Sequence, residues 1–175
     1  MPKRHHRVSK VSEENETHIL VTLVEDRPGV MQRVSGLFRK RNFNIDSITV
    51  GHSEKPGISR ITLMVAGDEH VLEQVIKQLN KLIEVIKITE LEDENSVQRE
   101  LALIKIKVKN EAARADIVQY TNIFRGRIVD VRKDSMIVEI TGDRAKLDAF
   151  IESVESFGVI ELAKTGVTAM TRGAK

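Results

Sequence analysis

Apolar residues recur along the chain with two spacings, first every second residue and then every third or fourth. In residues 18–25, Ile19, Val21 and Leu23 fall on one side of an extended chain, and Leu20 and Val24 fall on the other. Because both sides are apolar, this run predicts a strand that is covered on both faces. From residue 28 the spacing becomes helical, with an apolar stripe formed by Val30, Val34, Leu37 and Phe38.

The same spacings predict the next four elements. Strands are expected at 42–50, 58–66 and 82–92. A helix is expected to begin at Gly67-Asp68, and its apolar face would consist of Leu72, Val75, Ile76 and Leu79. The predicted order is therefore βαββαβ.

A second copy of this order follows. Strands are expected at 101–109, 125–131, 135–141 and 158–166, with helices at 110–121, where Asn110 is a candidate N-cap, and at 143–155. Four residues of the first copy reappear 75 positions later: Gly67, Asp68, Leu72 and Ile76 match Gly142, Asp143, Leu147 and Ile151. The sequence predicts an α+β protein with two tandem ferredoxin-like domains, each an antiparallel sheet covered by two helices.

The domain boundaries follow from composition. Residues 1–17 are polar and without periodicity, which predicts a flexible tail. The first domain is expected at 18–92, a linker at 93–98, which overlaps the acidic stretch "LEDENS" at 91–96, and the second domain at 99–175. Helices on one face would leave the other apolar face of the strand at 18–25 uncovered, and the outer strands would have open edges. We therefore expect a partner for both, most simply a second copy in a symmetric dimer.

Composition excludes several kinds of site and partner. The chain has no cysteine, which excludes disulfides, thiolate nucleophiles and cysteine-ligated metals, and which fits a cytoplasmic protein. Aromatic residues make up 3% and the net charge is +2, so no nucleic-acid partner is expected. No apolar stretch approaches the length of a membrane helix, so no membrane partner is expected. His18, His52 and His70 lie on separate elements, so we expect no metal site.

The turn Asp26-Arg27-Pro28-Gly29 joins the first strand to the first helix. Asp26 can act as N-cap, and Pro28 is tolerated near the first helical position. Glycine in a first turn costs up to about 1 kcal/mol relative to alanine, so Gly29 indicates close approach of a ligand or another backbone. The positive end of the helix suits a carboxylate, and Asp26 suits an ammonium group, so an α-amino acid fits this turn. The competing interpretation is a turn that only caps the helix.

Asn44 lies where the chain turns back from the first helix into the second strand. Its side-chain amide can both donate and accept, which suits a zwitterionic ligand. The competing interpretation is a turn residue that tolerates unusual backbone angles.

Several segments carry a resemblance to a known family: "DRPGVMQRVSGLFRKRNFNIDSITVG", "SRITLMVAGDEHVLEQVIKQLNKL", "RELALIKIKV", "IFRGRIVDV" and "KLDAFIESVESFGVIELAKTGVTAMTRG". They resemble the regulatory (small) subunits of acetolactate synthase, also called acetohydroxyacid synthase. The first half alone resembles an ACT domain, a module that binds amino acids. The resemblance covers nearly all of the chain from His18 onward and leaves out residues 1–17.

The resemblance implies an effector site shared by two ACT domains of a homodimer. The effector, typically valine, would contact Asp26, Gly29 and Val30 in one chain, and Asn44 and Ile45 in the other. Some family members have asparagine at the position of Asp26.

The resemblance also implies a subunit that performs no chemistry and has no catalytic residue, metal or cofactor of its own. It would activate a thiamine-diphosphate-dependent catalytic subunit, on which Mg and FAD are also expected, and confer feedback inhibition by valine or a related amino acid in branched-chain amino-acid biosynthesis. The second domain, from about Val97, would contact that catalytic subunit.

Two alternatives remain open at this point. The chain could be a free-standing ACT sensor of another enzyme. It could also be a small acylphosphatase-like enzyme, in which Arg27 and Asn44 would hold a phosphate, although Pro28 removes one of the amides that such a loop needs.

Overall fold

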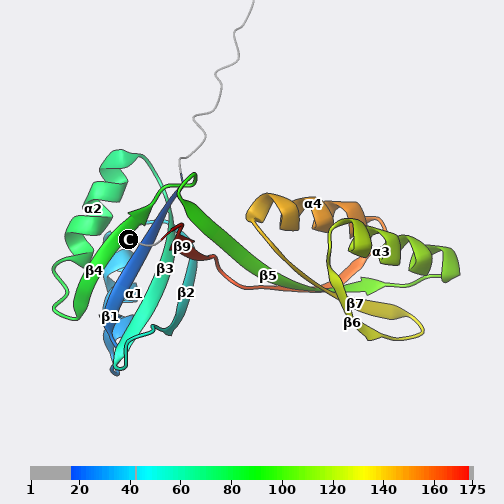
Figure 1. The fold of residues 1–175 in the computed structure, drawn as a ribbon, viewed down its shortest axis with the longest axis horizontal. Coiled ribbons are helices and arrows are strands. Elements are labelled where there is room, and N and C mark those ends of the chain that lie inside the picture. The colour runs from blue at the N-terminus through cyan, green and yellow to red at the C-terminus, as the bar shows by residue number, and fades with distance from the viewer. Residues whose placement is uncertain (1–16, 42, 174–175) are drawn as a thin grey trace, which may run out of the picture.

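The computed structural model describes residues 17–41 and 43–173, and shows two α+β units side by side, joined by one long strand (Figure 1). The predicted polar tail lies outside the described residues except for Thr17, which is the first residue of a strand. In the part of the chain that the structure describes, no helix is both long enough and apolar enough to cross a bilayer.

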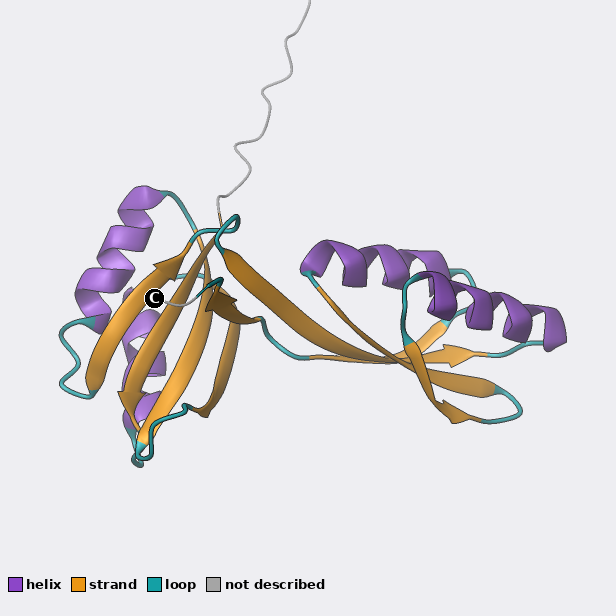
Figure 2. Cartoon of the chain, viewed as in Figure 1, coloured by secondary structure: helices purple, strands orange, loops and turns teal. Residues whose placement is uncertain are grey.

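The first domain has the predicted βαββαβ order. Its elements are β1 (Thr17–Glu25), α1 (Val30–Arg41), β2 (Ile45–His52), β3 (Ile58–Ala66), α2 (Glu69–Leu79) and β4 (Val85–Leu91). The sheet has the order β2-β3-β1-β4, with all neighbours antiparallel, so β2 and β4 are the outer strands. Both helices cover one face of this sheet (Figure 2). The core between them contains most of the predicted helical stripes: Val30, Val34, Phe38, Leu72, Val75 and Leu79.

The second domain repeats this topology. Its elements are β5 (Ser96–Lys107), α3 (Glu111–Ile123), β6 (Arg127–Val131), β7 (Ser135–Gly142), α4 (Arg144–Glu155) and β8 (Val159–Lys164), in the sheet order β6-β7-β5-β8. The predicted N-cap is confirmed, because Asn110 Oδ1 accepts from the Ala113 amide at 2.8 Å. The predicted fold class, two tandem ferredoxin-like domains, is confirmed.

The internal repeat has a local physical cause at the start of α2 and α4. Asp68 and Asp143 are the N-caps, and their carboxylates accept from the amides three residues later at 2.9 and 2.8 Å. A Cβ on Gly67 would lie 2.7 Å from the side chain of Val71, and one on Gly142 would lie 2.5 Å from that of Lys146. Glycine is required before α2, where Gly67 has φ +154° and Val71 Cβ blocks a side chain, whereas before α4 the flexible Lys146 side chain would have to move. Both helices have a capping aspartate at the same place.

One strand was not predicted. β9 (Thr168–Thr171) pairs antiparallel with residues 96–99 at the beginning of β5. Residues 96–98, which the sequence places in the linker, are therefore part of a strand, and only the turn at 92–95 separates the two domains along the chain. The rest of β5 belongs to the second sheet, so this one strand connects both domains (Figure 1).

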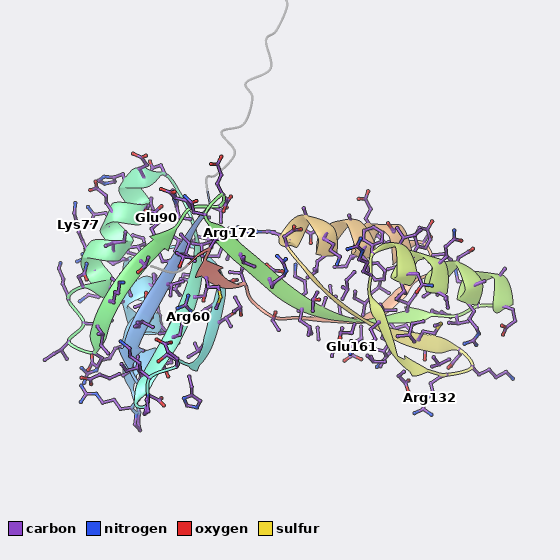
Figure 3. The ribbon with its side chains drawn as sticks, viewed as in Figure 1. Arg60, Lys77, Glu90, Arg132, Glu161 and Arg172 are labelled. Carbon is purple, nitrogen blue, oxygen red and sulfur yellow. The ribbon has the colours of Figure 1, made fainter. Side chains whose placement is uncertain are left out.

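The C-terminal segment covers the second face of the first sheet. Val167 and Ala169 pack with Ile19, Val21 and other residues on the side of β1 that faces away from the helices. Arg60, labelled in Figure 3, donates from β3 to the carbonyl oxygen of Ala169 at 2.8 Å. The expectation that a partner must cover this apolar face is therefore wrong, because much of it is covered by the chain itself. The outer strand β2 keeps an open edge.

Val167→Ala tests how much the packing of the C-terminal segment against the first sheet contributes to stability. Val167 is 2% exposed, so removing its two methyl groups should lower the free energy of unfolding by about 2 kcal/mol. Met170 on the same segment is 60% exposed, and Met170→Ala should change the stability little. Urea unfolding of both variants measures the difference, and equal stabilities would contradict the packing described here.

Candidate functional site

The loop after β1 places Gly29 directly before α1. The carbonyl oxygen of Gly29 accepts the Arg33 amide at 3.1 Å, which is the first α-helical hydrogen bond. Gly29 has φ +88°, a conformation that side chains with a Cβ disfavour. The backbone itself therefore requires glycine, which the sequence-based argument missed. A Cβ built on Gly29 would meet no atom within 4 Å, so the space in front of the helix is open.

Asp26 does not cap α1, contrary to the prediction. Its carboxylate Oδ2 lies 3.1 Å from Nδ1 of His52, the last residue of β2, and its amide donates to the carbonyl oxygen of Gly57 at 2.9 Å. The half-exposed carboxylate is thus held at the end of the sheet, beside the loop. His52 was not expected at this place, because the spacing along the sequence does not show that β2 ends next to this loop.

The first turn of α1 leaves donors available. In the described part of the chain, the amides of Met31 and Gln32 have no hydrogen-bond acceptor, and the first turn contains no acidic residue. The positive end of a twelve-residue helix therefore faces the open space in front of Gly29. Val30 contributes only its backbone there, because its side chain is buried in the core.

A buried carboxylate, that of Glu84, anchors the loop between β1 and α1. Glu84, in the connection between α2 and β4, is buried, and its Oε1 accepts from Arg33 and, at 3.4 Å, from Arg27. Its carbonyl oxygen accepts the Glu25 amide at 3.0 Å, so side chain and backbone both hold the end of β1. The sequence signal for Glu84 was an acid within the apolar stretch "LIEVIKI", which sequence analysis did not single out.

Asn44 and Ile45 lie at the opposite end of the same sheet. In the register of β1 and β3, Glu25 pairs with Ile58 and Thr17 with Ala66, and the Ala66 amide donates to Asn44 O at 3.3 Å. Eight residues of strand separate the two ends, which corresponds to about 25 Å. One chain therefore does not bring the five predicted residues together: Asp26, Gly29 and Val30 form one half-site, and Asn44 and Ile45 form another.

Comparison with known proteins identifies the family. A family profile described as the small subunit of acetolactate synthase matches residues 99–173, and one described as an ACT domain of the small-subunit type matches residues 20–87. The chain is 57% identical over 162 residues to a protein named probable acetolactate synthase small subunit from Methanothermobacter thermautotrophicus, covering 93% of this chain and 96% of that protein. The chain belongs to the acetolactate synthase small-subunit family.

Further comparisons agree with this assignment. The chain is 47% identical over 159 residues to the acetolactate synthase small subunit of Mycobacterium bovis, with 91% and 94% of the two chains covered. The crystal structure of the acetolactate synthase small subunit from Thermotoga maritima matches with a TM-score of 0.85 and 47% identity, and covers 91% of this chain and 99% of that chain. As a member of this family, the chain is a regulatory, non-catalytic subunit of acetolactate synthase, and a catalytic large subunit is its partner.

The acylphosphatase-like alternative loses its geometric basis in the structure of this small subunit. Arg27 lies 2.8 Å from Glu25 and contacts Glu84, while Asn44 is at the far end of the sheet, where its amide donates to Asp46 at 3.1 Å. The two residues cannot hold one phosphate within a chain. Among the described residues, no group of three or more His, Asp or Glu side chains is placed to hold a metal ion.

Proposed function

We propose that this small subunit binds the catalytic subunit of acetolactate synthase, raises its activity, and makes it sensitive to feedback inhibition by valine or a related branched-chain amino acid. The observation that carries the proposal is the separation of the two half-sites. Each half-site has groups that suit an amino acid, yet they lie at opposite ends of one sheet. Such an arrangement makes sense when two chains share the site.

A symmetric dimer along β2 would join the half-sites. β2 is an outer strand, and its apolar residues Ile48 and Val50 are 40% and 45% exposed. If β2 pairs antiparallel with β2 of a second copy, the start of one strand lies beside the end of the other. Asn44 of the partner subunit would then approach His52 and Asp26. The same contact would cover the two apolar side chains and satisfy the open edge.

The chemistry of the combined site fits an α-amino acid with a small apolar side chain. The amides of Met31 and Gln32 at the positive end of α1 would hold the carboxylate. The carboxylate of Asp26 would hold the ammonium group, and the amide of Asn44 can bond to either group. Ile45 of the other chain would supply apolar contact beside the open space at Gly29.

The remaining parts of the complex belong to the catalytic subunit. We propose that thiamine diphosphate, Mg and FAD are bound there, that the second domain makes the contact with it, and that the complex works in the cytoplasm in branched-chain amino-acid biosynthesis. The absence of cysteine from this sequence supports the cellular location.

Calorimetry and reconstitution test the proposal together. Titration of the full chain with valine, leucine and isoleucine should detect binding of at least one, at one site per chain. Addition of the chain to the purified catalytic subunit should raise acetolactate formation, and the bound amino acid should reverse that increase. Binding without stimulation would favour a sensor of another enzyme, and the absence of both would overturn the proposal.

A further inference from the structure

The strand that directly follows Asn44, β2, is also the strand that the second domain touches. The amide of Val167 donates to Ser47 Oγ on β2 at 3.1 Å. A Cβ on Gly166 would lie 2.7 Å from Thr49 Oγ1 and 3.0 Å from the carbonyl oxygen of Ile48. The backbone of the segment after β8 therefore lies directly on β2, and only glycine fits at position 166.

A second contact reaches the effector half-site itself. The carboxylate of Asp46 is shared: Oδ1 accepts from Asn44 Nδ2 at 3.1 Å, and Oδ2 lies 3.8 Å from Nη1 of Arg144. Arg144 is the first residue of α4 in the second domain. The side chain of Asp46 thus connects Asn44, which is predicted to bind the effector, with a helix of the other domain.

The charges continue into the second domain. Arg144 Nε lies 3.8 Å from Asp148 Oδ2, and Asp148 Oδ1 lies 3.5 Å from Lys164 Nζ. Lys164 Nζ lies 3.2 Å from Oε2 of the buried Glu100, close enough for an ion pair but without hydrogen-bond geometry. Alternating charges therefore run from β2 to β5, the strand that connects the domains.

The junction has room to change. Asp46, Met64, Glu100, Arg144 and Lys164 are among the residues around a cavity of about 330 Å³ between the domains. Exposed ion pairs contribute about 0–1 kcal/mol each, so the partners of Arg144 can change at little cost. The contact of Gly166 with β2 is tighter, because backbone and hydroxyl atoms leave no space there. The ion pairs can change partners while the backbone contact of Gly166 with β2 holds. The domains can therefore shift relative to each other without separating.

We propose that this interdomain junction, defined as Asp46, Ser47 and Thr49 on β2 against Arg144, Gly166 and Val167, transmits occupancy of the effector site to the second domain. The inference rests on the function proposed above. A ligand that accepts from Asn44 Nδ2 takes this donor away from Asp46, whose carboxylate then turns fully to Arg144. The attraction between Asp46 and Arg144 at the start of α4 then increases, and the second domain moves relative to the first. By linkage, the catalytic subunit bound to the second domain must change the affinity for the effector by the same factor.

The ratio of two dissociation constants measures this coupling. Valine is titrated by calorimetry into the full chain alone and into the chain saturated with catalytic subunit. For the wild type, the two constants should differ by a factor of about 5, the lower end of the range for allosteric coupling, because exposed ion pairs carry up to about 1 kcal/mol. For Arg144→Gln, Ser47→Ala and Gly166→Ala, the ratio should fall towards one. The constant of the free chain should change by no more than about twofold, because these residues do not touch the effector.

Two control variants match the test variants. Lys77→Gln removes a cation from the outer side of α2, far from the junction (Figure 3); Lys77 hydrogen-bonds to Glu73 at 2.7 Å and thereby lowers the pKa of Glu73. Gly36→Ala adds the same methyl group as Gly166→Ala at a place where it meets no atom within 4 Å. Both controls should keep the wild-type ratio.

The outcomes separate the two proposals. If the wild type has a ratio different from one and the three junction variants keep it, the junction does not transmit the signal, although the proposed function stands. If the wild type binds none of the branched-chain amino acids, the proposed function and the junction fall together. Because Arg144→Gln is a surface substitution, it remains informative even if Gly166→Ala fails to fold.

Discussion

Gly29→Asp should abolish the response to valine while the chain still stimulates the catalytic subunit. The new carboxylate would occupy the open space in front of α1, where the carboxylate of the effector is expected to bind. Placing two like charges together in a binding site costs several kcal/mol, so the affinity for valine should fall about 100-fold or more. Calorimetry with the full chain measures the affinity, and the reconstituted complex shows whether stimulation remains.

Gly29→Ala is the matched control for this experiment. Both variants have to adopt the backbone of Gly29 at φ +88°, which costs about 1–3 kcal/mol for a residue other than glycine. Alanine places only a methyl group into open space, so it shows the effect of the strain alone. The alanine variant should bind valine much more tightly than the aspartate variant. Equal losses would mean that the loop conformation, and not the occupied space, determines binding.

The architecture could be predicted from the sequence because its local signals agree with one another. Both domains use glycine and a capping aspartate before the second helix, and Gly67-Asp68 and Gly142-Asp143 stand at the same offset in the two copies. The inward faces of β3 and β7 follow the same alternation. Periodicity and capping are properties of neighbouring residues, so they can be detected without knowledge of the tertiary structure.

The contact between the domains could not be predicted in this way. β9 has four residues, of which only Ala169 and Met170 are apolar, so it carries no clear strand pattern. It forms because its partner at the beginning of β5 lies about 70 residues earlier in the chain, and because Ile19 and Val21 need cover. Such a pairing is determined by tertiary contacts, which periodicity does not reveal.

For the candidate site, the sequence suggested residues but did not show how they are held. Gly29 was singled out because a ligand or another backbone was expected to approach it. The structure adds a requirement that the sequence did not show, which is its positive φ, and no protein atom lies within 4 Å of a Cβ built there. Asp26 was expected to cap α1 but lies beside His52. Glu84, which anchors the loop, is an acid buried between two arginines from different elements, and no spacing rule brings these three residues together.

The separation of the half-sites leads to the second prediction with a large effect. Gly29→Asp damages the half-site at the loop, and Asn44→Ala damages the half-site at the start of β2, so neither variant alone should bind valine. When the two are mixed and allowed to exchange subunits, each heterodimer has one doubly damaged site and one intact site. Random exchange makes half of the dimers heterodimers, so about one quarter of the wild-type sites should return. The stoichiometry in calorimetry measures this fraction.

A mixture of the wild type with the double variant Gly29→Asp, Asn44→Ala provides the matched control. If two chains share each site, every heterodimer in this mixture lacks an intact site, and about one quarter of the sites should remain. If each chain binds valine alone, about half should remain, and the mixture of single variants should recover none. The two mixtures contain the same number of altered residues, so differences in stability cannot produce this pattern. The register of the first sheet places Asn44 and Gly29 at opposite ends, so a site that uses both residues has to be formed by two chains.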